Sequence, residues 1–414
     1  MKATPVKGTA DYLPSQALLR DYMQGIILDT YRSAGFERIL TPAIEHLENL
    51  EKSDGGDNLN LMFKIMKRGE KLAEAIAAGG QENELADLGL RYDLTLPLSR
   101  FYAANRAKLN NPFKCIQIDK SYRAERPQKG RMREFIQCDI DILGSESPLC
   151  ELELIHTTAT ALNRLDVGSF TIKINDRLIL KGCLAACGVA PEQMDTVCIS
   201  LDKWDKIGAE GVQGELEGKE IAADVVAKLI SLLSGDRSME SVQALCGETE
   251  ELTRTRQLIE NVRSLANGSY EAEFDLLLVR GQGYYTGTVF EIQSNKFRGS
   301  IGGGGRYDGL VGKFTGENVP AVGFSIGFER IFAILQEQGY QIPTRQRRVA
   351  VLCEESEAVQ AMQLAETLRK NGDSAGVYTR PKKLGKFLNR LEEQGFDGYL
   401  VYGETEEPKW FEQK

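Results

Sequence analysis

The stretch KCIQIDKSYRAERPQKGRMREFIQCDIDILG, residues 114–144, decides the fold, because it alternates polar and apolar residues along two arms that flank a turn. The first arm is polar at every odd position from Gln117 to Glu125, with Ile116 and Ile118 between polar neighbours. The polar face of the second arm consists of Arg133, Gln137, Asp139 and Asp141. A period of two is typical of strands with one buried face. The stretch therefore predicts an antiparallel hairpin with a core face and a face available for chemistry.

The tip of this hairpin is basic. Pro127 and Gly130 are turn residues, and residues 123–133 hold five Lys or Arg against one Glu in a chain whose formal charge is -9. Arginine suits bidentate contact with phosphate oxygens, and we expect Arg123 in mid-strand, where it would be held rigidly. A solvated charged face is the alternative for an ordinary hairpin. Glu125 and Asp141 on the same face instead favour a face that holds cationic ligand groups or a metal.

Residues 123–144 resemble motif 2 of the class II aminoacyl-tRNA synthetases, in the form found in the histidyl-tRNA synthetase family. The resemblance implies that Arg123 is catalytic and contacts the α-phosphate of ATP. Further ATP-binding residues implied by it are Glu125, Arg131 and Phe135. It assigns Gln137 and Asp141 to histidine. At the tip it implies tRNA contacts by Arg126, Gln128 and Lys129.

Composition limits the classes of protein. A chain of 414 residues can form two or three domains, and neither an apolar run long enough to cross a bilayer nor a signal peptide is present, so we expect a cytoplasmic protein without membrane contact. A pI near 5.2 argues against indiscriminate nucleic-acid binding, and a nucleic acid would have to bind at basic patches. These are the hairpin tip and residues 380–390. The eight scattered cysteines are expected to be reduced, and two histidines cannot form a metal cluster, so any metal site is unknown.

The segments before the hairpin predict a helix over residues 16–33, then a strand around Pro42, then a strand in LGLRYDLTLP, residues 88–97. In the last of these, Arg91, Asp93 and Thr95 would share a face, which could also be simple surface alternation. The Pro42 segment resembles motif 1, which forms the dimer interface in class II synthetases. The resemblance assigns Asp93 and Thr95 to the α-amino group of histidine. RYDLT is similar to the eukaryotic and archaeal branch of the family.

The segments after the hairpin predict mostly helices over residues 177–267. In FDLLLVRGQGYYTGTVFEI, residues 274–292, they predict a strand, a glycine turn and a returning strand. RGQGYYTG resembles the first histidine signature, which makes Arg280 catalytic in adenylate formation and places Tyr285 beside the imidazole. Gln282 and Gly283 depart from the family's Leu-Asp. SIGGGGRYDGLV resembles the second signature, with Tyr307 on the imidazole side. Its four glycines predict backbone packed against ligand, with a flexible loop as the alternative.

The last part of the chain predicts a strand and helix over residues 321–335, a linker at 336–346 and a βαβαβ domain at 347–414. GFSIGFERI resembles motif 3, whose arginine, here Arg330, binds ATP. The C-terminal domain resembles the anticodon-binding domain of the family, apparently truncated. The insertion at 177–267 would clasp the tRNA acceptor stem by the same resemblance.

The resemblance implies an α+β fold. A catalytic domain on a mostly antiparallel sheet would comprise residues 1–176 and 268–335. The implied activity is histidine–tRNA ligase. ATP with Mg²⁺ would activate histidine to histidyl-adenylate, and the histidyl group would then be transferred to the 3'-terminal ribose of tRNA(His). The resemblance also implies a homodimer. The alternative is the non-catalytic regulatory subunit of ATP phosphoribosyltransferase, which shares this core. Such proteins usually lack the C-terminal domain and degrade the motif 2 or signature arginines, whereas Arg123, Arg280 and Arg330 are all present here.

Overall fold

The computed structural model describes residues 1–52, 60–81, 84–280, 284–343 and 345–412. The chain divides into two compact units. The first comprises Met1–Asp11 and Arg20–Gly339, and the second comprises Tyr12–Leu19 and Tyr340–Lys414. No helix in the described ranges is both long enough and apolar enough to cross a membrane.

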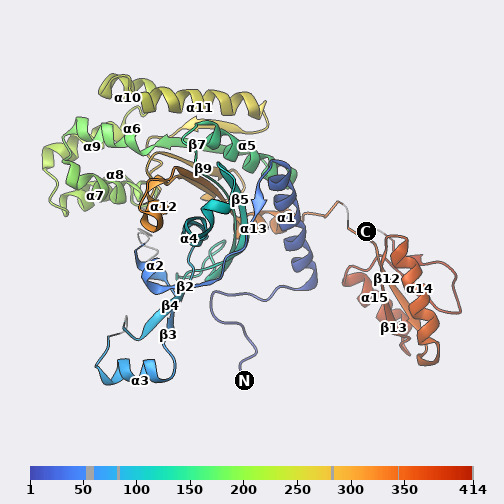
Figure 1. Ribbon diagram of the computed structural model, residues 1–414. Coiled ribbons are helices and arrows are strands. Elements are labelled where there is room, and N and C mark those ends of the chain that lie inside the picture. The colour runs from blue at the N-terminus through green and yellow to red at the C-terminus, as the bar shows by residue number, and fades with distance from the viewer. Residues whose placement is uncertain (53–59, 82–83, 281–283, 344, 413–414) are drawn as a thin grey trace. The chain divides into compact units, whose positions relative to one another are not determined.

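The first unit is built on an eight-stranded sheet (Figure 1). In sheet order its strands are β1 (Glu37–Arg38), β5 (Phe113–Tyr122), β6 (Glu134–Leu143), β11 (Ala321–Gly327), β10 (Ser300–Arg306), β9 (Thr288–Ser294), β7 (Phe170–Asp176) and β8 (Glu271–Phe274). Only the two edge pairs, β1 with β5 and β7 with β8, are parallel. This mostly antiparallel sheet with its helices confirms the predicted α+β class.

The β5–β6 hairpin has the predicted faces. Asp119 lies opposite Gln137, and Gln117 lies opposite Asp139. Residues opposite each other in an antiparallel pair share a face, so these polar groups gather on one side. The apolar side is covered by helices α5 (Leu149–Arg164) and α13 (Phe328–Glu337), and Ile140 there is fully buried. The helix predicted at residues 16–33 is α1 (Pro14–Ser33).

The strand predicted through Thr95 is wrong beyond Leu90. Strand β4 (Ala86–Leu90) forms a separate sheet with β2 (Ile44–His46) and β3 (Lys64–Met66), and helix α4 (Thr95–Asn105) follows. A carboxylate oxygen of Asp93 accepts a hydrogen bond from the Leu96 amide at 3.2 Å, which satisfies a free donor in the first turn of α4. The alternation at residues 91–95 thus belongs to a helix start. The strand predicted around Pro42 is likewise divided, because β1 and β2 belong to different sheets, with α2 (Leu47–Glu51) after β2.

The hairpin predicted over residues 274–292 is also wrong. Strand β8 ends at Phe274, β9 begins at Thr288, and both strands pair with β7. The Asp275 carboxylate accepts a hydrogen bond from the Leu277 amide at 3.1 Å, which turns the chain away from the sheet. Gln282 and Gly283 lie outside the described residues. The glycine run that could have been a flexible loop is strand β10, in the interior of the sheet.

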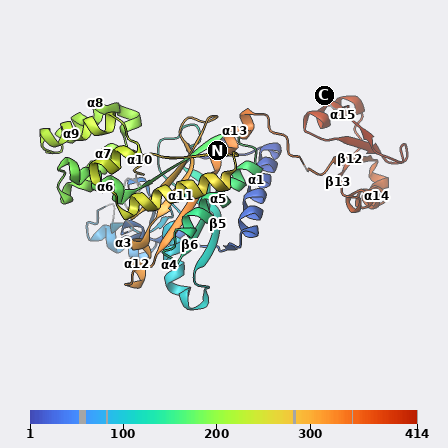
Figure 2. The same ribbon diagram turned by 90° about the horizontal axis from the view of Figure 1, so that it is seen from above.

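The region predicted as a helical insertion consists of helices around their own core. They are α6 (Arg177–Cys187), α7 (Met194–Leu201), α8 (Trp204–Glu217), α9 (Ala223–Ser234), α10 (Met239–Cys246) and α11 (Glu250–Ala266). Leu180, Leu184 and Leu229 are buried in that core. Helix α11 runs beside α5 in both views (Figures 1 and 2). All eight cysteines are free, as expected for reduced thiols.

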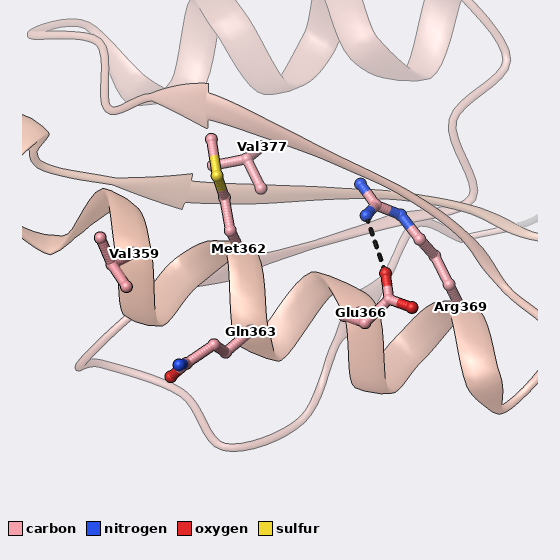
Figure 3. Close-up of a pocket in the computed structure, with 6 residues that line it drawn as sticks. All are labelled: Val359, Met362, Gln363, Glu366, Arg369 and Val377. Atoms are coloured by element: carbon pink, nitrogen blue, oxygen red, sulfur yellow. Dashed lines mark hydrogen bonds and ion pairs between the residues drawn. The ribbon is translucent and has the colours of Figure 1, made fainter.

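The second unit has the predicted alternation of strands and helices. Its parallel strands are β12 (Arg348–Cys353), β13 (Ser374–Thr379) and β14 (Gly398–Val401). Strand β15 (Lys409–Trp410) is antiparallel to β14 at the edge of the sheet. The helices are α14 (Ala358–Lys370) and α15 (Leu384–Glu393). A hollow of about 560 Å³ lies over α14 and β13, where Val359, Met362 and Val377 lie near the Glu366–Arg369 ion pair (Figure 3). None of the predicted site residues lines it.

Candidate functional site

The polar face of the sheet is arranged in rows that cross five strands. One row runs from Gln117 through Asp139, Ser325 and Gly303 to Glu291. The next row runs from Cys115 through Asp141, Gly323 and Gly305 to Val289. Rows two residues apart lie on the same face of a sheet. Carboxylates of β6 therefore lie beside glycines of β11 and β10.

The glycines make room for side chains of the first histidine signature and of β6. A β-carbon at Gly303 would lie 2.0 Å from Nη1 of Arg280, and one at Gly305 would lie 2.9 Å from Cδ1 of Tyr285. At Gly323 a β-carbon would lie 2.0 Å from an oxygen of Asp141. No real β-carbon fits at such distances, so only glycine allows this close approach. We expected this glycine backbone to pack against a ligand. It packs instead against side chains that would themselves contact the ligand.

Arginines from three separate segments gather at one side of this face. Arg280 pairs with Glu291 at 3.2 Å, and Nη1 of Arg330 donates to the Ser300 carbonyl oxygen. Burial lowers the pKa of Arg330, and the charge of Arg131 lowers it further, followed by that of Arg280. Glu291 and Glu125 oppose this effect. Such a cluster of guanidinium groups suits a polyanion such as a nucleoside triphosphate.

Arg123 lies one residue beyond the end of β5, rather than in mid-strand, but its amide still donates to the Arg133 carbonyl at 2.9 Å. Its Nε donates to the Tyr92 carbonyl at 2.9 Å, and its guanidinium lies 5.1 Å from the centre of the Phe135 ring. Its charge lowers the pKa of Asp93, which burial raises. The structure therefore places Arg123 and Phe135 next to the segment that starts α4.

A buried carboxylate and three tyrosines form the other side of the site. The Tyr307 hydroxyl donates to Asp141 at 2.6 Å. Burial raises the pKa of Asp141 to about 7, against the lowering effect of that hydrogen bond. The Tyr284 ring lies 4.9 Å from Tyr285 and 6.0 Å from Tyr307. The site residues that the sequence indicated on β6 and on both signatures thus come together, and Tyr284 joins them although only its neighbour was predicted.

The predicted tRNA contacts lie apart from these buried groups, at the exposed tip of the hairpin. Gln128 and Arg131 exchange backbone hydrogen bonds of 3.0 and 2.9 Å, which closes the turn. Arg126 is exposed, and Lys129 forms an ion pair with Glu337 at the end of α13. The tip is therefore a folded basic loop that leaves cationic groups accessible.

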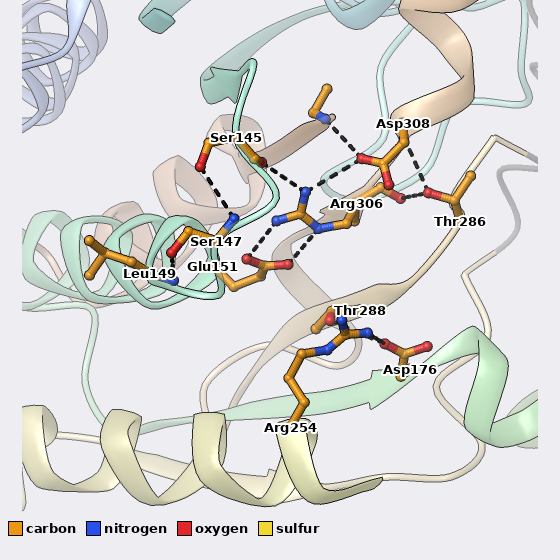
Figure 4. Close-up of polar contacts among 11 residues, drawn as sticks. Ser145, Ser147, Leu149, Glu151, Asp176, Arg254, Thr286, Thr288, Arg306 and Asp308 are labelled. Atoms are coloured by element: carbon orange, nitrogen blue, oxygen red, sulfur yellow. Dashed lines mark hydrogen bonds and ion pairs between the residues drawn. The ribbon is translucent and has the colours of Figure 1, made fainter. Parts of the chain in front are cut away.

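A network of polar contacts holds the end of β10, immediately before Tyr307 (Figure 4). Arg306 binds both oxygens of Glu151 at 2.7 and 2.8 Å and donates to the Ser145 carbonyl at 3.1 Å. Asp308 accepts from the Ala321 amide at 2.9 Å. Arg306 and Asp308 stand in the second signature, but nothing in the sequence pointed to Glu151, because its partner is 155 positions away.

No cluster of three potential metal ligands is present in the described part of the chain. Mg²⁺ is commonly held by one or two carboxylates together with substrate phosphates. Glu125 and Glu291, which both raise the pKa of Arg330, provide two such carboxylates. The residues present therefore fit a metal that arrives with ATP.

The antiparallel sheet, the hairpin arginine and the arginine at the start of α13 define a class II aminoacyl-tRNA synthetase catalytic unit. The model of the histidyl-tRNA synthetase family matches residues 8–331, and the chain belongs to that family.

Two relatives named histidine–tRNA ligase and one crystal structure of a histidyl-tRNA synthetase are similar to this chain. A histidine–tRNA ligase of Leifsonia xyli is 44% identical over 80% of this chain and 80% of its own length, and one of Christiangramia forsetii is 34% identical over 97% and 92%. The crystal structure of histidyl-tRNA synthetase from Nostoc sp. PCC 7120 is 28% identical, with a TM-score of 0.78 over 96% of this chain and 91% of that one. The predicted family is therefore confirmed.

Proposed function

We propose that the chain is a histidine–tRNA ligase, which forms histidyl-adenylate from histidine and ATP and then transfers the histidyl group to tRNA(His). The names of the relatives confirm the predicted ligase class. The observation that carries the mechanism is the sheet face on which Arg280, Tyr285 and Asp141 lie against glycines. It joins a cationic end for phosphates to an acidic, aromatic end for an amino acid with an imidazole.

Histidine would bind at the acidic end. Asp141 accepts one imidazole N–H while Tyr307 holds its carboxylate, and Tyr285 covers the ring. The α-amino group is assigned to Asp93 and Gln137, together with Thr95, the first residue of α4. This order leaves the substrate carboxylate toward Arg123, whose charge acts on Asp93.

ATP would bind at the cationic end. Arg123 and Arg280 contact the α-phosphate, Phe135 and Arg330 hold the adenine, and Arg131 lies near the outer phosphates. Negative charge develops on the phosphorus in the transition state, and guanidinium groups already in place stabilise it there. Bound Mg²⁺ would supply further charge neutralisation, with Glu125 and Glu291 as its carboxylates. No side chain is required as nucleophile, because the substrate carboxylate attacks.

The tRNA would contact Arg126, Gln128 and Lys129 at the tip, and the second unit would bind the anticodon side through the basic face of α15, which presents Lys383, Lys386 and Arg390 beside Phe387. A second copy of the chain would pack against the motif 1 segment. Leu40 and Ile44 on either side of Pro42 are 69% and 50% exposed and would supply apolar area for such a contact.

Histidine-dependent exchange of pyrophosphate into ATP tests the proposal. A ligase exchanges label only when histidine is present, and charging of tRNA(His) follows. A regulatory subunit would give neither. Absence of exchange in a folded protein that binds histidine would favour that alternative.

A further inference from the structure

Asp139 lies on the polar face of β6 between Gln137 and Asp141, and the motif resemblance gives it no role. Its side chain is buried, with 4% of the residue exposed. Oδ2 accepts a long hydrogen bond of 3.4 Å from Nε2 of Gln137, and Oδ1 has no hydrogen-bond partner among the described residues. A buried polar oxygen without a partner is costly, so such an atom in an active site is a candidate ligand-binding acceptor.

The residues that flank Asp139 on neighbouring strands have partners of their own. Gln117 on β5 donates to the Leu94 carbonyl at 3.0 Å and accepts from the Thr41 hydroxyl at 3.1 Å. Ser325 on β11 accepts from Nε2 of Gln137 at 3.4 Å, and its hydroxyl also lies near enough to Asp139 to lower the pKa of that carboxyl through a hydrogen bond. Turning Gln117 toward Oδ1 would break contacts that it already makes.

The charges around Asp139 favour a cation. Burial raises the pKa of Asp139 well above its ordinary value, the carboxylate of Asp141 raises it further, and a hydrogen bond with Ser325 lowers it. The carboxylate of Asp93 raises this pKa and the charge of Arg123 lowers it. Three carboxylates thus face one guanidinium in a buried site. Along β6, Asp139 lies two residues nearer than Asp141 to Glu134, which is opposite Tyr122, the residue before Arg123. Asp139 therefore lies at the end of the site nearer Arg123, where the group next to the reacting carboxylate of an amino acid would lie.

We propose that Asp139 binds the α-ammonium group of the amino-acid substrate, together with Asp93, and so selects for a free amino group. This inference rests on the proposed function, because it requires histidine in this site with its carboxylate toward Arg123. It makes the amino-group subsite more acidic than the resemblance implied.

Titration calorimetry with the full-length chain and three probes tests this. The probes are histidine, histidinol, which lacks the carboxylate, and 3-(imidazol-4-yl)propionate, which lacks the amino group. We expect Asp139→Asn to weaken histidine and histidinol by roughly tenfold or more, since a hydrogen bond to a charged group is lost, and the propionate by less than about twofold. Glu134→Gln is the matched control, because it removes one negative charge from the opposite face of β6, where Glu134 pairs with Lys120. We expect it to bind all three probes normally.

Other outcomes overturn the inference. Equal weakening of all three probes means that Asp139 binds the imidazole that they share or only supports the fold, and unchanged affinities mean that it contacts no substrate. Failure of the unaltered protein to bind histidine would overturn the proposed function itself. If Asp139→Asn does not fold, Asp139→Glu decides, because it keeps the carboxylate and moves it by one methylene. It should change the affinity for histidine and histidinol more than that for the propionate, and equal changes contradict the proposal.

Discussion

The β5–β6 hairpin and the β10–β11 pair form the same sheet face in opposite ways. The hairpin contributes side chains, among them Gln137, Asp139 and Asp141. The other pair contributes glycines at 303, 305 and 323, whose lack of a β-carbon lets Arg280 and Tyr285 lie against the backbone. The hairpin half of the site thus depends on the side chains that it contributes. The glycine half depends on the absence of β-carbons. A substitution should therefore act by loss of a group in the first half and by displacement of a distant group in the second.

The largest effect is expected in the hairpin half. Arg123→Ala should reduce histidine-dependent pyrophosphate exchange by a factor of a hundred or more, because one lost donor to transition-state charge costs roughly 3 kcal/mol. Arg123→Lys should rescue little, since an ammonium cannot replace the planar guanidinium. Lys120→Ala, an exposed neighbour on β5 that pairs with Glu134, is the control. Undiminished exchange in the alanine variant would remove Arg123 from the mechanism.

The glycine half should respond by displacement. Gly303→Ala puts a methyl group where Nη1 of Arg280 lies and 2.8 Å from the Phe290 carbonyl oxygen, and we expect about a tenfold to hundredfold loss of exchange. If displacement of Arg280 dominates over the backbone contact, the Gly303→Ala/Arg280→Ala double variant should be hardly worse than Arg280→Ala alone.

Gly309→Ala is the matched control for this cycle, because a β-carbon there would meet no atom within 4 Å, and Gly309 lies in helix α12 (Asp308–Thr315). It should exchange normally. Additive losses in the double variant would show that Gly303→Ala damages the sheet rather than the placement of Arg280.

The same contrast explains how much the sequence could predict. Alternation gave both faces of the hairpin, because each strand contacts its neighbour within the same stretch. It failed at residues 91–95, where buried Arg91 donates to the Thr41 and Lys120 carbonyls at 2.7 and 2.8 Å and thus mimics a polar strand position. The hairpin predicted after Phe274 was also wrong, because β8 and β9 each pair with β7 and not with each other. The role of Gly303 could not be predicted, because the side chain it accommodates comes from another segment.

A smaller effect is expected at the hairpin tip, which lies outside both halves. Arg126→Ala/Lys129→Ala should reduce tRNA charging several-fold and make it more sensitive to salt, since phosphate contacts release counterions. Exchange should stay nearly unchanged, because neither residue lies among the buried groups of the site. Loss of exchange together with charging would mean that the tip serves ATP rather than tRNA.

The smallest effect sharpens the comparison at the hydrogen bond from Tyr307, the residue after β10, to Asp141 of the hairpin. Asp141, with a pKa of about 7, gains its charge as the pH rises through neutrality, so histidine affinity should rise over the same range. Tyr307→Phe removes an interaction that lowers this pKa, and the rise should move to higher pH, with a loss of about fivefold at pH 7 and less at pH 9. Calorimetric titration of histidine from pH 6 to 9 measures both curves. The imidazole of free histidine titrates identically in the two experiments, so a difference in midpoint reports on the protein. Coincident midpoints would show that Asp141 is not the group that controls histidine binding.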